Sequence, residues 1–234
     1  MYRILLKETK ENYYLSPCTS KFFGLPGLWN EFEWPEATDG HHDDQYYIDF
    51  ICQINCAEAA EHDKDGILPK TGMLYFFYDK QNGKRKDNSN TVVFYYDGDL
   101  YDDGGFYKLL PSYPEDYATF ASFDSPEDLE KSELALEFEF DEYKGDNEHG
   151  YPQWASDESE KHYPHYLLGI PGDPGQMGLG SMGKLPDNQQ LLFTLNNYVG
   201  KGMYGIFNEI HWLIEKDDLA KRDFSKACTV VVYD

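Results

Sequence analysis

Positive charge is scarce in this sequence of 234 residues. There are 20 lysine and arginine residues against 43 aspartate and glutamate residues, which gives a formal net charge of −23 at pH 7. A surface with this charge repels phosphate backbones and anionic lipid headgroups, so we expect no nucleic-acid partner and no membrane surface. Two interpretations stay open: the charge serves solubility alone, or it attracts a basic protein.

Cysteine pairs and long apolar runs are also missing. The four cysteines, Cys18, Cys52, Cys56 and Cys228, include no Cys-x-x-Cys pair and no spacing typical of a metal site. Residues 1–15 contain one short apolar run, which is too short for a signal sequence. No stretch reaches the roughly 20 apolar residues that a membrane helix needs. These absences predict a protein of the reducing cytoplasm with no cofactor and no metal.

Aromatic residues, by contrast, are abundant, with 20 tyrosines and 15 phenylalanines. Such side chains favour strands and large half-buried surfaces. The runs 46–58, 70–79 and 90–97 are dense in aromatic and β-branched residues, which predicts three strands. Apolar and acidic residues alternate over 134–143, which predicts a further strand with one wet face.

Helices are predicted to be few and short. Ser125 and Ser156 precede acidic residues, a pattern typical of a helix start. The last third of the chain repeats the strand pattern of the first, since "LLFTLNNYV" is similar to "DFICQINCA". We therefore predict an internal duplication, with related halves at roughly 20–110 and 160–234 in a single domain spanning 1–234. The predicted fold class is α+β, mainly antiparallel β-sheets with a few short helices.

Five motifs occur in the order in which a known family has them. They are "SKFFGLPGLWNEFEWP", "FICQINCAE", "LPKTGMLYFFYD", "HYLLGIPGDPGQM" and "DDLAKRDFSKA". Together they resemble the YwqG-like family of uncharacterised bacterial proteins, a family of unknown function. The resemblance implies a single α+β domain with an internal duplication, and it implies no catalytic residue. The chain departs from the family pattern at Phe23, at Thr194 and around Met203.

Gln53 and Asn55 are the candidate ligand-binding residues, together with Asn196. The first two are polar and share one face of an otherwise apolar strand, and Asn196 matches Asn55 in the second half. Buried amides need hydrogen-bond partners, and backbone groups at strand ends usually supply them. The amides are therefore either structural or part of a cleft shared by the two halves.

The stretch "MGLGSMGKLP" matches two nucleotide-binding motifs by letter but not by context. No strand leads into Gly178, and Pro186 interrupts a helix that would start at Gly183. Leu185 stands where a P-loop needs serine or threonine. We predict a connector rather than a phosphate site.

Clusters of potential metal ligands lack a spacing that fits a metal. Asp97, Asp99, Asp102 and Asp103 suit calcium by donor type, but the distal glutamate of an EF-hand is missing, so a solvated turn is the favoured interpretation. Two further groups have the residue types of metal ligands, and we predict solvated loops for both: His41, His42, Asp43 and Asp44, and His162 with His165.

Catalytic patterns are weak as well. Glu137, Glu139 and Asp141 share one strand face, as carboxylates of a glycosidase would, but the wet face of an edge strand has the same pattern. A Gly-x-Ser-x-Gly nucleophile motif is missing. The sequence therefore favours a non-enzymatic binding module, one version of which engages a basic partner as bacterial immunity proteins do. The alternative is a hydrolase-type enzyme with a polar cleft between the two halves.

Overall fold

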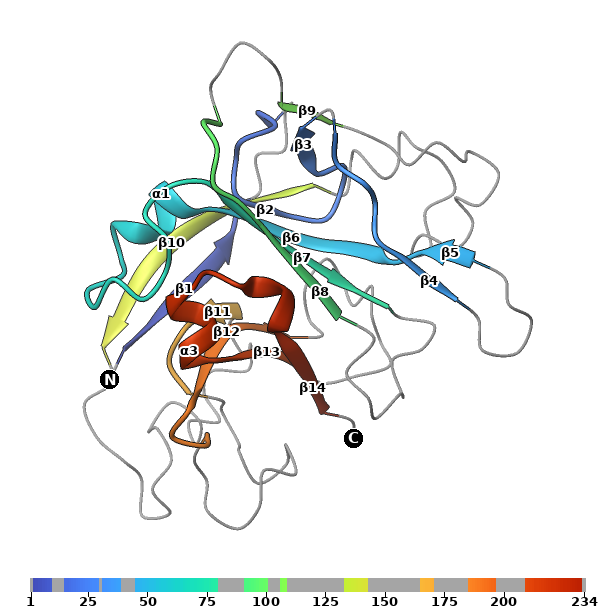
Figure 1. The fold of residues 1–234 in the computed structure, drawn as a ribbon. Helices are drawn as coiled ribbons and strands as arrows, with labels where there is room; N and C mark the ends of the chain where they lie inside the picture. Colours follow the sequence, from blue (N-terminus) through green and yellow to red (C-terminus); the bar gives the residue numbers. More distant parts are fainter. Residues whose placement is uncertain are drawn as a thin grey trace. The chain divides into compact units, whose positions relative to one another are not determined.

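In its described residues, the computed structural model of this chain consists mainly of β-strands (Figure 1). The described residues are 2–9, 15–29, 31–38, 45–79, 91–100, 106–108, 133–142, 165–170, 185–196 and 209–232. No helix in these ranges is long and apolar enough to cross a membrane.

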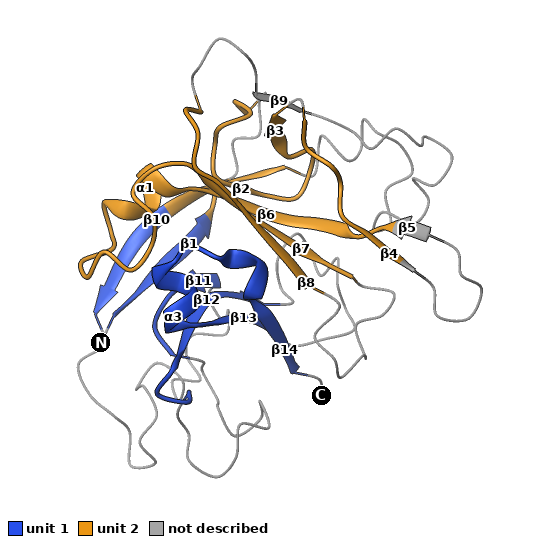
Figure 2. Ribbon diagram, viewed as in Figure 1, with its two compact units in different colours: residues 1–7, 138–234 blue, residues 8–137 orange. Residues whose placement is uncertain are grey.

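Two compact units divide the chain (Figure 2). Unit 1 consists of Met1–Lys7 and Phe138–Asp234, and unit 2 consists of Glu8–Glu137. Strand β10 (Leu134–Glu142) contributes residues to both units. The first strand, β1 (Tyr2–Glu8), thus belongs almost entirely to the unit that Phe138–Asp234 builds.

Unit 2 is built on an antiparallel sheet. From the beginning of β10, the strand order is β10, β2 (Lys21–Phe22), β6 (Asp49–Asn55), β7 (Met73–Tyr78) and β8 (Thr91–Tyr96). Helix α1 (Cys56–Ala60) follows β6 directly. Two small antiparallel pairs complete the unit: β3 (Gly27–Trp29) with β9 (Phe106–Lys108), and β4 (Glu36–Thr38) with β5 (Gln45–Tyr47).

Unit 1 has an antiparallel sheet of the same kind. Starting from β1, the order is β1, β11 (His165–Leu167), β12 (Gln189–Asn196), β13 (Glu209–Glu215) and β14 (Cys228–Val232). A short helix, α3 (Lys216–Ala220), and a 3₁₀ turn, η4 (Phe224–Lys226), connect β13 to β14.

The predicted α+β class is wrong, because the chain is mainly antiparallel β-sheet. In the described ranges the α-helices are α1 and α3, with five residues each. A helix of this length is not stable on its own and serves here as a connection between strands. The helix starts expected at Ser125 and Ser156 lie outside the described residues.

The two units repeat the same backbone geometry. Strand β6 has a register shift between Phe50 and Cys52 where it pairs with β7, and β12 has one between Leu191 and Phe193 where it pairs with β13. In β6, Gln53 comes three residues after Phe50 and lies opposite Tyr75 of β7. In β12, Thr194 comes three residues after Leu191 and lies opposite His211 of β13. By this register Gln53 corresponds to Thr194, and Tyr75 corresponds to His211.

The turn that follows the second strand of each sheet is also repeated. Two consecutive residues have positive φ in each turn, 53° and 69° at Phe23 and Gly24, and 59° and 82° at Leu168 and Gly169. The N–H of Phe23 donates to the carbonyl of Ile51 at 2.9 Å, and the N–H of Leu168 makes the equivalent bond to Leu192 at 3.2 Å. These equivalences support the predicted internal duplication, which stays a prediction.

Candidate functional site

Gln53 holds the chain segment that leads into β3. Its Oε1 accepts a hydrogen bond from the backbone N–H of Gly27 at 2.8 Å. Its Nε2 donates to the carbonyl oxygens of Pro17 and Thr19, at 2.7 Å each. The side chain is fully buried, and three of its hydrogen-bonding positions are used by the backbone. This set of contacts fits the structural interpretation of the amide.

Asn55 ends β6 and begins α1. Its Oδ1 accepts a hydrogen bond from the N–H of Ala57 at 3.0 Å, which makes it the N-cap of the helix. Its Nδ2 donates to the carbonyl of Cys18 at 3.1 Å, and its own N–H donates to Oγ of Ser20 at 2.8 Å. The structure thus brings Gln53 and Asn55 together over one segment, residues 17–20.

Asn196 belongs to unit 1, at the end of β12. It is buried, and its N–H donates to Nδ1 of His165 at 3.0 Å. This bond matches the bond from Asn55 to Ser20 in unit 2, with an imidazole in place of a hydroxyl. The role of Gln53, Asn55 and Asn196 as ligand-binding residues stays a prediction.

Tyr75, like Gln53, binds the backbone of Gly27, and the sequence did not reveal this contact. Its hydroxyl donates to the carbonyl of Gly27 at 2.6 Å, so Gln53 and Tyr75 hold both polar groups of this residue. Burial raises the pKa of the Tyr75 hydroxyl, which therefore stays protonated and keeps donating at neutral pH. In the sequence, Tyr75 is one of several aromatic residues in a predicted strand, so nothing marks it as a functional candidate.

A buried ion pair stabilises the turn at Gly24. The Nζ of Lys21 lies 2.6 Å from Oε1 of Glu133, and the two side chains are 0% and 4% exposed. Lys21 also donates to the carbonyl of Leu25. Because each charge is buried, removing either partner would leave the other uncompensated. The sequence gave no signal for this pair, because its members are 112 residues apart.

Thr194, His211 and Glu209 form a hydroxyl–imidazole–carboxylate series in unit 1. The Oγ1 of Thr194 lies 2.9 Å from Nδ1 of His211, and the Nε2 of His211 lies 3.0 Å from Oε2 of Glu209. The same order of groups activates a nucleophile in hydrolases. Here Thr194 and His211 are both 0% exposed, so no substrate reaches the hydroxyl in this structure.

The predicted carboxylate face of β10 is occupied by ion pairs. Asp141 accepts from Nε of Arg3 at 2.7 Å, and Glu139 pairs with Lys7. Glu137 is exposed and belongs to unit 2. This distribution fits the wet face of a strand better than a pair of catalytic acids.

The other candidate ligands are only partly described. No group of three or more potential metal-binding side chains occurs in the described part of the chain. Asp97 and Asp99 follow β8, and the remaining candidates lie outside the described residues: Asp102, Asp103, His41, His42, Asp43, Asp44, His162 and the glycines from Gly178 to Gly183.

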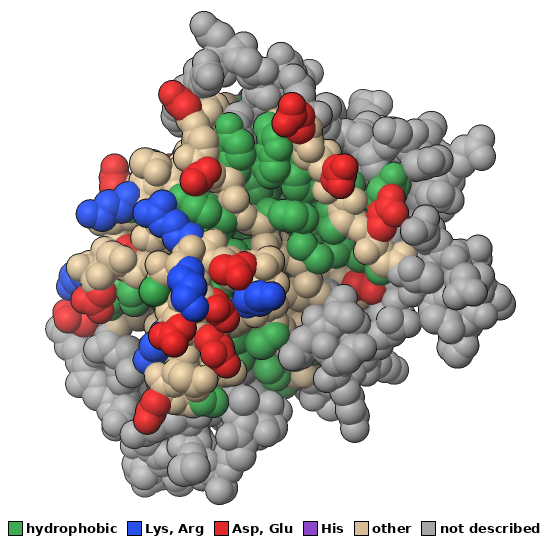
Figure 3. Space-filling model, viewed as in Figure 1, with side chains coloured by type: hydrophobic (Ala, Val, Ile, Leu, Met, Phe, Trp, Pro, Cys, Tyr) green, Lys and Arg blue, Asp and Glu red, His purple; other side chains and the backbone are tan. Residues whose placement is uncertain are grey.

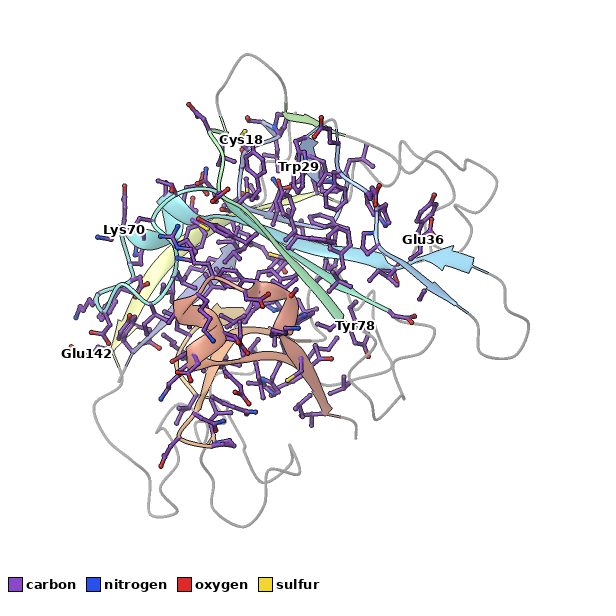
Figure 4. All side chains as sticks on the ribbon, in the orientation of Figure 1. Cys18, Trp29, Glu36, Lys70, Tyr78 and Glu142 are labelled. Atoms are coloured by element: carbon purple, nitrogen blue, oxygen red, sulfur yellow. The ribbon has the colours of Figure 1, made fainter. Side chains whose placement is uncertain are left out.

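Half-buried aromatic side chains gather in unit 2. Trp29, Phe32, Trp34, Phe94 and Tyr96 pack against a buried cluster, and Figure 4 labels Trp29 in this region. The rings of Trp29 and Tyr96 are stacked at 4.9 Å, and Phe32 meets Phe94 edge-on at 5.1 Å. These rings form a continuous aromatic surface.

Acidic side chains accompany these rings. Glu31 and Glu33 are exposed and alternate with Phe32 and Trp34, and Glu36 and Asp97 are exposed nearby in the sequence. None of the four acids makes an ion pair with a described residue. Figure 3 shows hydrophobic side chains open to solvent on this face, with acidic side chains at the border. We call the five aromatic and four acidic residues the aromatic–acidic patch.

Taken together, fold and site define a mainly antiparallel β protein whose buried polar residues hold backbone segments in place. The model of a domain of unknown function, DUF1963, matches residues 20–232, and the chain belongs to this family. No curated protein matches the chain. The family description assigns no activity, and the YwqG-like label and the bacterial origin stay predictions.

Proposed function

We propose that this protein is a non-enzymatic binding module that engages a basic protein partner. The observation that carries the proposal is the aromatic–acidic patch, where four exposed carboxylates that make no ion pair with a described residue accompany half-buried rings. Carboxylates attract a cationic partner over a distance, and the rings supply the apolar area that stabilises the complex after contact. The net charge of −23 extends the attraction beyond the patch.

The alternative, a hydrolase-type enzyme with a polar cleft between two halves, has less support. The hydroxyl and imidazole of Thr194 and His211 are buried, and the amide of Gln53 is engaged with backbone groups. An immunity-like role, in which the partner is a basic toxin, is the version of the binding proposal that the charge favours. We propose the cytoplasm as the location, supported by four free cysteines.

The proposal is tested by affinity capture with a salt series. The immobilised protein is incubated with lysate of its own cells at about 0.05 M salt and washed at about 0.15 M and 0.5 M. We expect a basic protein that stays bound at 0.15 M and is displaced by free protein. Isothermal titration with the purified partner then gives the affinity. Recovery of acidic proteins only, or of no protein at the lowest salt, contradicts the proposal.

A further inference from the structure

We propose that the aromatic–acidic patch binds an arginine-bearing segment of the basic partner. This inference rests on the proposed function and specifies both the surface and the side chain that it recognises. A guanidinium group is planar and weakly hydrated, so it can stack on an aromatic ring while its edge bonds a carboxylate. The patch offers both groups side by side in the sequence, since Glu31 and Glu33 flank Phe32.

Comparison of the two units shows that two of these rings stand where unit 1 has aliphatic residues. By the register described above, Phe94 and Tyr96 of β8 correspond to Val230 and Val232 of β14. Both sheets keep the same order of strands and the same hydrogen-bonded turn, so this type of sheet forms in unit 1 with aliphatic residues at these two positions. In unit 2 the two rings pack against the buried cluster and stay only half-buried, so part of each ring is open to a ligand.

Charge decides which ligand this surface favours. Four exposed carboxylates make no ion pair with a described residue, so their negative potential favours a cationic ligand. A second copy of this chain is disfavoured as the occupant, because each copy carries a net charge of −23. A lysine also neutralises carboxylates, but its strongly hydrated ammonium group stacks less well on a ring. Arginine is therefore the preferred side chain.

Binding of fluorescein-labelled peptides tests the inference directly. The probes are arginine–glycine, lysine–glycine and glutamate–glycine repeats of 12 residues, measured by fluorescence polarisation at about 0.1 M salt. We expect the arginine peptide to bind about fivefold more tightly than the lysine peptide, and the glutamate peptide not to bind.

Two triple variants with the same change in net charge distinguish binding at the patch from attraction by the net charge of the protein. The patch variant carries Glu31→Gln, Glu33→Gln and Glu36→Gln, and the control carries Asp187→Asn, Glu215→Gln and Asp217→Asn, which are exposed in unit 1. We expect the patch variant to weaken binding of the arginine peptide about tenfold and the control to weaken it about twofold or less. Near-UV circular dichroism confirms that both variants are folded.

A further variant places the aliphatic residues of unit 1 in unit 2. The double substitution Phe94→Val and Tyr96→Val should reduce the preference for arginine over lysine to about twofold or less, while the charge stays unchanged. Equal weakening of peptide binding by the two triple variants overturns the patch proposal, and so does an unchanged preference for arginine in the double variant. The proposed function still stands after either result if a basic partner is captured. If neither cationic peptide binds and no basic partner is captured, both proposals fail.

Discussion

Gln53 and Gly27 are joined by a hydrogen bond of 2.8 Å from the backbone N–H of Gly27 to the side-chain Oε1 of Gln53. The bond fixes the backbone at the point where β3 begins, two residues before Trp29 of the aromatic–acidic patch. A buried amide in a central strand thus positions a surface loop, which links the core of unit 2 to its proposed binding surface.

Replacing Gln53 by methionine should destabilise the protein by about 3 kcal/mol or more. Methionine keeps the volume but leaves the N–H of Gly27 and two carbonyl groups without their partner, and unsatisfied buried groups cost about 1–3 kcal/mol each. Urea denaturation measures the change. Gln190→Met is the control, because the side chain of Gln190 makes one hydrogen bond among the described residues, to the carbonyl of Leu191 at 3.0 Å. Its loss should cost about 1 kcal/mol or less. Equal losses would contradict a clamping role of Gln53.

Gly24→Ala should be much more damaging than Gly66→Ala. Both residues have positive φ, 69° and 64°, so the backbone strain of an alanine is similar, about 1 kcal/mol. A methyl group at Gly24 would also lie 2.1 Å from Cγ of Glu133, whereas nothing lies within 4 Å at Gly66. Thermal unfolding should therefore show a loss of about 3 kcal/mol or more for the first substitution and about 1 kcal/mol for the second. A similar loss for both would contradict the close contact with Glu133.

Glu58→Gln should raise the melting temperature at pH 7 more than at pH 4. Burial raises the pKa of Glu58 above its ordinary value of 4.5, although hydrogen bonds from Ser20 oppose the shift. With a raised pKa in the folded state, its contribution to stability is complete at low pH and is lost as the pH rises through that pKa. Glutamine keeps the acceptor for the N–H of Ser20 and removes the charge. Melting curves between pH 4 and 7 measure the difference, with the exposed Glu61→Gln as control; a gain that does not grow with pH would contradict the shift.

Iodoacetamide should label Cys228 before any other cysteine of the folded protein. Cys18, Cys52 and Cys56 are buried, whereas Cys228 is half-buried. Burial raises the pKa of the Cys228 thiol, and the charge of Glu215 raises it further, so labelling should be slower than for a free thiol at pH 8. Glu215→Gln should accelerate it, by less than about threefold. Mass spectrometry of the labelled peptides measures the rates, and first labelling at a buried cysteine would contradict the described packing.

The strands could be predicted because the residue types that favour a strand lie within one short stretch of the sequence. Dense aromatic and β-branched runs predicted β6, β7 and β8, and the alternation of apolar and acidic residues predicted β10. The fold class could not be predicted in the same way, because helix-start signals say nothing about how long a helix will be. Such signals therefore do not establish an α+β fold.

The candidate site was only partly accessible to sequence reasoning. Gln53 and Asn55 stand out because polar residues are rare in an apolar strand, but their partners come from a segment more than 30 residues away. The pair Lys21 and Glu133 depends on a sheet contact that no local pattern encodes. The aromatic–acidic patch has a usable signal in the sequence, because acids and aromatic rings alternate from Glu31 to Trp34.

Strand β1 sets the order in which this chain can fold during synthesis. Its residue Ile4 pairs with Leu167 of β11, so the strand has no partner there until most of the chain has been made. At about 5–20 residues per second, this delay is on the order of ten seconds or more. Unit 2 is continuous from Glu8 to Glu137, so all of its residues are made before β11. The nascent chain therefore carries an apolar strand without its β11 partner through much of translation, the period in which strand edges are most prone to aggregate.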